Sequence, residues 1–333
     1  MKIMILTPFP PDGIGGAETF VKDLISAAKK THDIYLCTMG KRRSPWRGTG
    51  LFNLFSTFPY LFIKAFILNV SVRPQIIHAQ GLISGAIAVL LKKIFNNKVL
   101  VTLLALYEFD KKPTIFHAVS RWIFLNSDCV FVEGLKGSQD MYSAFIPILK
   151  HMGDMTKYKV NVKQFNHWVN QDIFNPDPNR IKDGIIRILF VGRPIKEKGH
   201  HVIEKAEYLL KGHREYEFIY IQNTPHEDLP KYYQMADIVV VPSLYPEGFS
   251  RVVAEAASCW CAVITSNKGS LPEMVRDFGV IFDGTAEDLV LNIKNITEEK
   301  KYSKLFSLSY TAYDYALRNF NIKNSEVILN EYK

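Results

Sequence analysis

Two glutamates eight positions apart, Glu247 and Glu255, flank a short glycine-containing turn in the stretch VPSLYPEGFSRVVAEAA. The preceding DIVVVPS is typical of a buried parallel strand, and SRVVAEAAS is typical of the helix that follows such a strand. This layout places Gly248, Phe249 and Ser250 at a helix N-terminus, where free backbone N–H groups bind anionic phosphate. We expect the two acids to hold hydroxyl groups of a bound sugar nucleotide.

A second pair of candidates, Arg193 and Lys198, follows another predicted strand, IRILFVG, and precedes Gly199 and a predicted helix. Arginine binds a diphosphate as a planar fork, and lysine binds it as a point charge. When a sugar nucleotide transfers its sugar, the diphosphate leaves and negative charge grows on its oxygens, so preorganised cations lower the barrier. We therefore predict that Arg193, Lys198 and Glu247 form the catalytic group.

A glycine-rich loop follows the first predicted strand, in TPFPPDGIGGAETFVKDL. Gly15 and Gly16 stand directly before a predicted helix, and glycine lets the backbone approach a phosphate closely there. Similar loops also occur where they only end a strand, so this motif alone leaves both interpretations open.

Together, these segments resemble the signatures of the retaining glycosyltransferases with the GT-B fold, glycosyltransferase family 4 (group 1). PSLYPEGFSRVVAEA is similar to the family's PS-x-x-E-G-F-G-x-x-x-x-E-A, with one extra residue before the first acid and Ser250 in place of the last glycine. GRPIKEKG matches the family's diphosphate-binding pair, GGAE resembles its first donor loop, and NKGSLPEMV resembles its G-G-x-P-E-x-V segment. We expect Glu273, in the last segment, to be an acid of a helix N-terminus rather than a catalytic residue.

The resemblance implies a role for each of these residues. Glu247 would hold the hydroxyls of the donor sugar, Glu255 would hold the ribose, and Gly15 and Gly16 would close over the donor. The acceptor hydroxyl would attack from the front face with the leaving phosphate as base, which retains the anomeric configuration. No Asp-x-Asp pair occurs in the chain, although enzymes that hold the diphosphate through a divalent metal commonly use one. We therefore predict no essential metal and no cofactor.

The resemblance is looser in the first half of the chain, where the acceptor would bind. His78 matches a family histidine before the acceptor-side helix, and a structural histidine at a strand end is an equal alternative. Tyr107 and Glu108 lie in the loop where the acceptor should enter. Leu104 stands where the family often has a histidine near the donor sugar, and Trp168 replaces a glycine of the family's interdomain segment.

Apolar runs alternate with helical patterns along the whole chain, which predicts an α/β fold with doubly wound parallel sheets. The alternation restarts after NPDPNRIKDG, residues 175–184, which we interpret as the linker. With the resemblance, this predicts the GT-B arrangement of two Rossmann-like domains facing each other across a cleft. We place an acceptor-binding domain at residues 1–170, a donor-binding domain at 171–316, and a C-terminal helix at 317–333 that packs back on the first domain. Only a short helix fits between EFIYIQ and DIVVVPS, so we expect the second domain to be compact.

The composition is that of a soluble globular protein, with 333 residues, 47% apolar and 22% charged. The spacing of the four cysteines fits no metal site, so we expect them to be buried and reduced. The opening MKIMILTPFP is better explained as a core strand than as a signal peptide. We expect a cytoplasmic protein.

The net charge of +8 favours anionic partners. The apolar window at residues 51–70 is about as long as a membrane span, but Asn53, Pro59 and Lys64 interrupt it, so we predict no transmembrane helix. KRRSPWR, residues 41–47, brings basic residues and a tryptophan just before this window, as in helices that lie on an anionic membrane surface. A solvated loop followed by a core helix is the alternative.

The favoured function is a retaining glycosyltransferase that moves a sugar from a nucleotide-diphosphate sugar to a hydroxyl of a glycan or lipid-linked acceptor. Such an enzyme would serve cell-surface polysaccharide synthesis, peripherally on the inner face of the cell membrane. The alternatives are a catalytically degenerate GT-B protein that acts as a binding or scaffold subunit, and a nucleotide-sugar epimerase. A phosphorylase of similar architecture would need a much longer chain. Nucleic-acid binding is not favoured, because the basic residues are scattered and match no nucleic-acid module.

Overall fold

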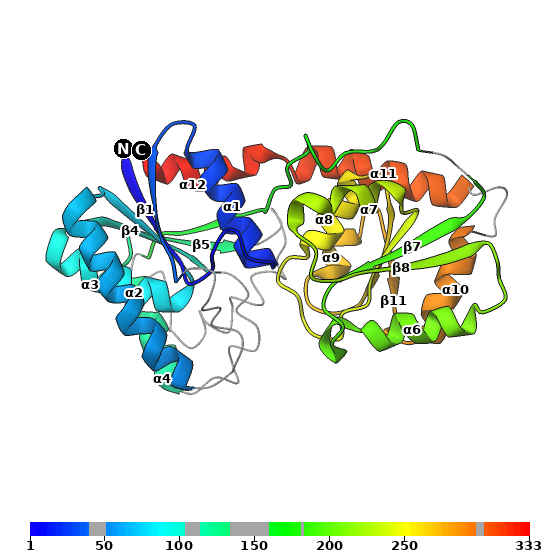
Figure 1. The fold of residues 1–333 in the computed structure, drawn as a ribbon, viewed down its shortest axis with the longest axis horizontal. Helices are drawn as coiled ribbons and strands as arrows, with labels where there is room; N and C mark the ends of the chain where they lie inside the picture. Colours follow the sequence, from blue (N-terminus) through cyan, green and yellow to red (C-terminus); the bar gives the residue numbers. More distant parts are fainter. Residues whose placement is uncertain (40–50, 104–113, 134–159, 181–182, 298–302) are drawn as a thin grey trace. The chain divides into compact units, whose positions relative to one another are not determined.

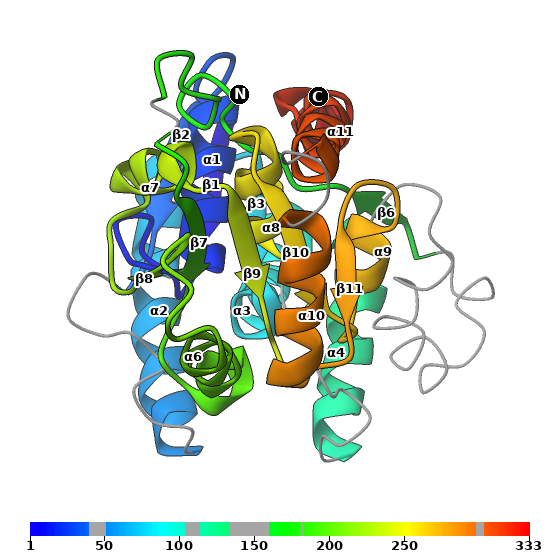
Figure 2. The same cartoon turned by 90° about the vertical axis from the view of Figure 1, so that its right-hand side faces the viewer.

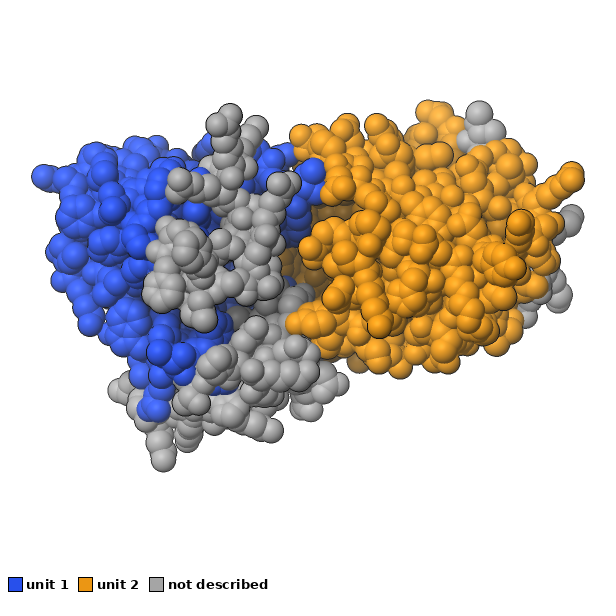
Figure 3. Space-filling view, turned by 60° about the horizontal axis from the view of Figure 1, so that its bottom comes forward, with its two compact units in different colours: residues 1–166, 325–333 blue, residues 167–324 orange. Residues whose placement is uncertain are grey.

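The chain divides into two compact units, which Figure 3 colours separately. The computed structural model describes residues 1–39, 51–103, 114–133, 160–180, 183–297 and 303–333. Unit 1 comprises residues 1–166 together with 325–333, and unit 2 comprises residues 167–324. Each unit is a parallel sheet with helices on its faces, so the predicted α/β class and the two Rossmann-like domains are confirmed (Figure 1).

Unit 1 contains a six-stranded parallel sheet of order β2-β1-β3-β4-β5-β6. Its strands are β1 (Lys2–Leu6), β2 (Asp33–Cys37), β3 (Ile76–Gln80), β4 (Lys98–Leu103), β5 (Cys129–Glu133) and β6 (Val162–Phe165). Its helices are α1 (Gly16–Ala28), α2 (Leu51–Val72), α3 (Gly81–Phe95), α4 (Thr114–Asn126) and α12 (Glu326–Leu329). The side chains of α2, α3 and α4 share one hydrophobic core with one face of the sheet.

Unit 2 contains a five-stranded parallel sheet of order β11-β10-β9-β7-β8. Its strands are β7 (Ile186–Val191), β8 (Tyr216–Ile221), β9 (Ile238–Val241), β10 (Ala262–Ser266) and β11 (Val280–Phe282). Its helices are α6 (His200–Leu209), α7 (Pro230–Met235), α8 (Arg251–Ser258), α9 (Leu271–Val275), α10 (Ala286–Thr297) and α11 (Ser303–Asn319). Between β8 and β9 the chain makes only a turn and the short α7, as predicted, while β11 was not predicted.

The strand order changes direction once in each sheet, between β1 and β3 in unit 1 and between β7 and β9 in unit 2. At such a switch point the two strands send their following loops in opposite directions, and ligands bind beyond the carboxyl ends of these strands. The sheet of unit 2 can be followed in Figure 2, where β7 and β9 lie next to each other. This topology singles out the loops after β7 and β9 as the place to look for a site.

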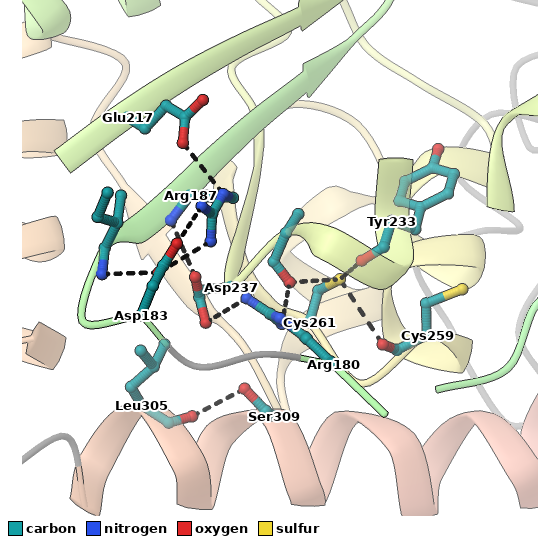
Figure 4. A network of polar contacts seen from close by, with 12 residues as sticks. Arg180, Asp183, Arg187, Glu217, Tyr233, Asp237, Cys259, Cys261, Leu305 and Ser309 are labelled. Carbon is teal, nitrogen blue, oxygen red and sulfur yellow. Dashed lines mark hydrogen bonds and ion pairs between the residues drawn. The ribbon is translucent and has the colours of Figure 1, made fainter. Parts of the chain in front are cut away.

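The segment at residues 175–184 was predicted to be the linker, and this interpretation is wrong. Its described residues are bound to unit 2: Arg180 Nη2 lies 2.6 Å from Asp237 Oδ1, and Arg180 Nη1 donates to the carbonyl of Ala236 at 2.8 Å. Asp183 pairs with Arg187 of β7 at 2.6 Å, within the network in Figure 4. The chain passes between the units earlier, between residues 166 and 167, rather than at the predicted 170/171 boundary.

The returning C-terminal segment is shorter than the predicted 317–333. Helix α11 continues to Asn319 and packs against α8 and β10, so residues 317–324 stay with unit 2. Residues 325–333 then join unit 1, where Glu331 pairs with Lys163 at 2.5 Å and with Lys98 at 3.1 Å. The prediction of a C-terminal segment on the first domain therefore holds in kind, but the segment begins at Ser325.

All four cysteines are buried and unpaired, as predicted. Burial raises the pKa of Cys37 to about 11 and that of Cys261 to about 12, so both thiols stay protonated at neutral pH. Among the described helices, none is both long and apolar enough to span a bilayer.

Candidate active site

The loops that follow β7 and β9 are joined to each other at the switch point of unit 2. The amide of Leu244 donates to the carbonyl of Glu197 at 2.9 Å. Gly199 has a left-handed backbone, with φ +69°, and a Cβ at this position would overlap the carbonyl oxygen of Pro242. Glycine is therefore required here on two counts, because L-residues are strained at this φ and because the two loops touch backbone to backbone.

This junction brings Lys198 and Glu247 together. Lys198 Nζ donates to Glu247 Oε1 at 2.8 Å, and the hydroxyl of Ser243 donates to the same oxygen. Glu247 is buried, while the side chain of Lys198 is 38% exposed. The lysine therefore keeps one side toward solvent, where its ammonium can contact a further anion while Glu247 holds its position.

The backbone of Glu247 is supported from the loop after β10. Ser270 N–H donates to the carbonyl of Glu247 at 2.9 Å. The preceding Gly269, with φ +59°, lies so close that a Cβ would overlap the backbone nitrogen and oxygen of Glu247. Gly269 and Ser270, which belong to the NKGSLPEMV segment, thus hold the backbone of Glu247 in place.

Several buried polar atoms in and after β10 have no hydrogen-bond partner in the part of the chain that the structure describes. They are Thr265 Oγ1, Ser270 Oγ and Glu273 Oε2. Buried polar atoms without a partner are few in native proteins, and each needs an explanation. A bound polar ligand is one such explanation. These three atoms belong to the same segments that support Glu247. Glu273 itself lies in the first turn of α9, as expected of a helix N-terminal acid.

The turn Gly248–Phe249–Ser250 leads into α8, as the sequence predicts. The ring of Phe249 is buried, stacked on His167 at 4.6 Å and packed edge-on against Phe320 at 5.8 Å. Ser250 is buried too, and its N–H donates to Met274 Sδ at 3.3 Å. The ring of Phe249 and the N–H of Ser250 are thus used in packing, and what remains for an anion is the other backbone N–H groups at the start of α8.

Glu255 is buried within α8, and both carboxylate oxygens are engaged. Oε1 accepts from His226 Nε2 at 2.7 Å and from Arg251 Nε at 3.4 Å, and Oε2 accepts from the hydroxyl of Tyr233 at 3.0 Å. Burial acts to raise the pKa of Glu255, but the hydrogen bond from His226 and the charges of His226 and Arg251 outweigh it and hold the pKa below its ordinary value. Glu255 therefore ties α8 to α7 and to the turn at residues 226–228.

Arg193 is exposed, and it forms no ion pair with Glu247, with Glu255 or with any other described residue. Of the two predicted cations, the structure thus brings Lys198 onto Glu247. Arg193 follows β7 and has no side-chain hydrogen bond to any described residue.

In unit 1, Gly15 and Gly16 lie at the start of α1, exposed to solvent. Gly15 caps the helix through its carbonyl, which accepts from Thr19 N–H at 3.0 Å and from the Thr19 hydroxyl at 2.9 Å. The first N–H groups of α1 lack helical partners, as at every helix start, which is the geometry expected of an anion-binding turn.

His78 is fully buried in unit 1, as expected of a structural histidine at a strand end. Its Nδ1 lies 2.5 Å from the hydroxyl of Tyr332, and its Nε2 lies 2.6 Å from Thr102 Oγ1. Burial lowers the pKa of His78 to about 3, so the ring is neutral. The other predicted acceptor-side residues, Tyr107 and Glu108, lie outside the described residues, as does Leu104.

Three residues of the site were not singled out from the sequence. Ser243 stands in the PS pair of PSLYPEGFSRVVAEA and Gly269 in NKG, so the motifs contained both without revealing their contacts with Glu247. His226 had no signal, because its partner Glu255 lies 29 positions away and no local pattern joins them.

A comparison with known families identifies part of unit 2. Residues 213–309 match the family described as Glycosyl transferases group 1. The match contains Glu247, Glu255 and Glu273, and it leaves out Arg193 and Lys198.

Among curated proteins, the similarities are also partial. The chain is 42% identical over 80 residues to O-antigen chain mannosyltransferase B of Escherichia coli, which covers 24% of this chain and 21% of that protein. It is 33% identical over 117 residues to D-inositol 3-phosphate glycosyltransferase of Corynebacterium diphtheriae, which covers 34% of this chain and 26% of that protein. The chain thus matches only about a fifth to a quarter of the length of these relatives.

Solved structures resemble the whole chain. Sucrose-phosphate synthase from Thermosynechococcus elongatus has a TM-score of 0.77 at 20% identity, over 99% of this chain and 97% of that chain. Anabaena HepE, solved in complex with UDP and glucose, has a TM-score of 0.72 at 16% identity, over 100% of this chain and 99% of that chain. At these identities the likeness shows the fold alone, and this fold is the predicted GT-B fold.

Proposed function

We propose that this protein is a glycosyltransferase that moves a sugar from a nucleotide-diphosphate sugar to a hydroxyl group of a glycan or a lipid-linked acceptor. The observation that carries the proposal is the pairing of Lys198 with Glu247 at the switch point of a sheet. The match of residues 213–309 to the group 1 glycosyl transferases supports it, because Glu247 belongs to that match.

In the proposed reaction, Lys198 and Arg193 neutralise the diphosphate of the donor. The ammonium of Lys198 is already oriented by Glu247, and the guanidinium of Arg193, which pairs with none of the described residues, supplies a planar fork for phosphate oxygens. Since these charges are in place before the diphosphate leaves, they favour the transition state without reorganisation. The backbone N–H groups at the start of α8 contribute further positive potential.

The other carboxylate oxygen of Glu247 would receive hydroxyl groups of the donor sugar. We propose that the acceptor hydroxyl attacks from the face the phosphate leaves, that its proton passes to the leaving phosphate, and that the configuration is retained, as in family 4. The bond between the anomeric carbon and the phosphate oxygen breaks while the bond to the acceptor oxygen forms. No metal is required in this proposal, because Lys198 and Arg193 supply the charge.

The donor belongs to the class of nucleotide-diphosphate sugars. HepE, which shares the fold, was solved with UDP-glucose. We propose that Gly15 and Gly16 act on the donor through their backbone. Glu255 would reach the ribose only by exchanging its bonds with His226 and Tyr233 for bonds to the nucleotide.

We propose that unit 1 holds the acceptor near the carboxyl end of β3. Both polar atoms of the Gln80 amide and the hydroxyl of Ser84 are buried there without a hydrogen-bond partner among the described residues. Groups of this kind stabilise a ligand that brings hydroxyls to them, because their desolvation has already occurred in the free protein. An acceptor from cell-surface polysaccharide synthesis, reached at the inner face of the cell membrane, fits the partial likeness to the O-antigen mannosyltransferase.

The test has two stages. Calorimetric titration with UDP, GDP and ADP is expected to give saturable binding of at least one nucleoside diphosphate, and binding of none would refute the proposal. Mass spectrometry of reactions that contain the matching sugar nucleotides and a membrane extract is then expected to show transfer. Binding without any transfer would favour the degenerate binding protein, and conversion of the donor to an isomer without acceptor would favour the epimerase.

A further inference from the structure

Trp260 occupies a backbone position that usually belongs to glycine. Helix α8 ends at Ser258. The N–H of Trp260 donates to the carbonyl of Ala257 at 3.2 Å, and the N–H of Cys261 donates to the carbonyl of Ala256 at 3.1 Å. These two hydrogen bonds form the Schellman motif, in which the residue after the C-cap has a left-handed backbone and is usually glycine. Here it is a tryptophan with φ +65°, which strains an L-residue, so the choice of side chain needs an explanation other than backbone geometry.

The indole of Trp260 lies against aromatic rings of α11, the helix that packs on α8 (Figure 1). Its ring centroid is 5.6 Å from that of Phe306 and 6.2 Å from that of Tyr313. The side chains of Trp260 and Phe306 are nevertheless 36% and 52% exposed. The contact therefore orders two large rings that both keep a third or more of their surface in solvent.

These rings continue as an apolar stripe along α11. Phe306, Tyr310, Tyr313 and Leu317 follow one another at intervals of four, three and four residues, which places them on one side of the helix. Tyr310 is 57% exposed and Leu317 is 42% exposed. Together with Trp260 we call these residues the aromatic stripe. Exposed apolar patches of this kind mark interaction sites, whereas isolated exposed apolar residues are ordinary.

The stripe is distinct from the side of α11 that packs on the core of unit 2. The buried residues of the helix repeat at the same intervals but one position earlier, which is a rotation of about 100° around the helix axis. They are Leu305, Ser309, Ala312 and Ala316. Helix α11 thus has two apolar sides, and the core of unit 2 covers one of them.

Intervals of four and three residues are those by which one helix packs along another. In this stripe the intervals also read the same in both directions. A two-fold axis between Tyr310 and Tyr313 therefore pairs the stripe with itself in an antiparallel arrangement, with Phe306 of one copy opposite Leu317 of the other. No residue of the stripe is charged, and Asp314 and Arg318 beside it form an ion pair with each other.

We propose that the aromatic stripe is a two-fold contact between two copies of this chain, with the two α11 helices antiparallel. Aromatic side chains, tryptophan and tyrosine above all, contribute most of the binding energy in contacts between proteins. The stripe offers roughly 400 Å² of exposed side-chain surface per copy, about half of what each partner buries in an interface of standard size. We therefore expect a reversible dimer with a Kd on the order of micromolar. A nucleic acid or an anionic surface fits less well, because no cation belongs to the stripe.

The inference goes beyond the proposed transfer reaction and does not depend on it. The site residues Lys198, Glu247 and Glu255 are not part of the stripe. Self-association can therefore be measured without donor, acceptor or turnover.

The first experiment is sedimentation of the full chain at concentrations from about 1 to 100 μM, which should show a monomer–dimer equilibrium. Tyr310→Gln with Leu317→Gln should raise the Kd about tenfold or more, because both changes remove apolar area from the contact. Trp260→Gly should also raise it, although glycine suits the left-handed backbone better than tryptophan. Circular dichroism should show both variants folded.

The matched control is Tyr208→Gln with Leu291→Gln, which changes two side chains of unit 2 that are 72% and 55% exposed and lie outside the stripe. The control should form the dimer as the unchanged protein does. Turnover per chain should be the same for the control and for Tyr310→Gln with Leu317→Gln, which separates a failure of the dimer from a failure of the proposed reaction. A chain that stays monomeric throughout, or a stripe variant that dimerises as well as the control, overturns the inference.

The second experiment tests the antiparallel orientation. Phe306→Cys and Leu317→Cys are treated with a short bifunctional maleimide, each variant alone and both mixed; the four native thiols are buried and do not compete. The mixture should give cross-linked dimers. Each variant alone should not, because equal positions of the two helices lie about 16 Å apart along the axis. Cross-linking that is as efficient in the single variants as in the mixture contradicts the proposed pairing.

Discussion

Lys198 and Glu247 form an ion pair of 2.8 Å although they follow different strands and lie 49 positions apart. The pair exists because β7 and β9 are neighbours in the sheet and because Gly199 allows the two following loops to touch. It places a partly exposed cation and a buried acid side by side, each fixing the direction of the other.

Replacing either partner is expected to lower transfer by orders of magnitude while leaving the fold intact. Lys198→Ala removes charge from the leaving diphosphate, and Glu247→Ala removes the group that orients both the lysine and the donor sugar. Because each single change already breaks the pair, the double variant should be only slightly slower than the slower single variant. The measurement is kcat/KM for transfer. Lys196→Ala is the control, because the side chain of this exposed lysine of the same loop makes no contact with any described residue. Unchanged turnover in both single variants would count against the assignment.

Replacing Gly199 or Gly269, which allow the loops of the site to touch, should destabilise the protein much more than replacing a surface glycine whose φ is also positive. Gly212→Ala, at φ +101° with open space around it, should cost about 1 kcal/mol of unfolding free energy, from the backbone alone. Gly199→Ala and Gly269→Ala should cost at least about 2 kcal/mol more, because their Cβ atoms would overlap backbone of Pro242 and of Glu247. Urea unfolding gives the comparison, and equal losses for all three variants would contradict the close approach.

Unit 1 should lose stability as the pH falls, through His78. The pKa of His78 is about 3 in the folded protein and 6.5 in the reference state, so the unfolded chain binds the proton first as the pH drops. Its stabilising contribution is complete above pH 6.5 and falls by about 1.4 kcal/mol per pH unit below that.

The check is to measure urea unfolding at several pH values from 7 to 4, with the near-ultraviolet circular dichroism as the signal of tertiary structure. His78→Gln should flatten the pH dependence, because glutamine does not titrate. Tyr332→Phe should keep the pH dependence and lower the stability by about 1–3 kcal/mol, because it leaves one ring nitrogen of His78 buried without a partner. A slope that is the same in the protein and in His78→Gln would show that another group is responsible.

Glu255 should prove at least as important for stability as for binding. Glu255→Ala would leave Tyr233 buried without its acceptor and would remove the carboxylate that pairs with His226, and the loss of one member of a buried pair costs about 3–5 kcal/mol. Glu255→Gln should cost much less, since the amide oxygen still accepts a hydrogen bond. As the pKa of Glu255 is lowered in the folded state from 4.5, its contribution is present above that pH and is lost as the pH falls further.

Calorimetry on Glu255→Gln then tests the ribose role. If Glu255 holds the ribose, the affinity for the nucleoside diphosphate should fall together with stability. His226→Asn is the matched variant, because it removes the shorter of the two hydrogen bonds on Glu255 Oε1 and should leave nucleotide affinity equal or improved. Nucleotide affinity that does not change in Glu255→Gln would make Glu255 a structural residue alone.

Most of the helices and strands, and the acids and cations at the ends of strands, could be predicted from the sequence; the three-residue β11 could not. Buried parallel strands are nearly continuous apolar runs, so β7 and β9 could be recognised without a structure, and the residues that directly follow them could be placed at one edge of the sheet. The pair of Lys198 and Glu247 follows from that placement together with the family resemblance.

What could not be predicted depends on contacts between distant parts of the chain. The polar, proline-bearing segment at residues 175–184 has the composition of a linker, and only the partners of Arg180 and Asp183 show that it belongs to unit 2. His78 was ambiguous because its partner Tyr332 lies 254 positions later. In the same way, the neighbours of Glu255 come from a turn whose sequence has no recognisable pattern.

The nine residues at 325–333 belong to unit 1 but follow all of unit 2 in the chain. During synthesis, the sheet of unit 1 is therefore made before residues 325–333, and until these emerge His78 lacks Tyr332, and Lys98 and Lys163 lack Glu331. Unit 2 is one continuous stretch, residues 167–324, so all of its residues are made before residues 325–333 of unit 1. A nascent chain that stalls or is cut before Ser325 would therefore contain the whole of unit 2 and an incomplete unit 1. Quality-control proteases would then cleave in unit 1, although it is synthesised before unit 2.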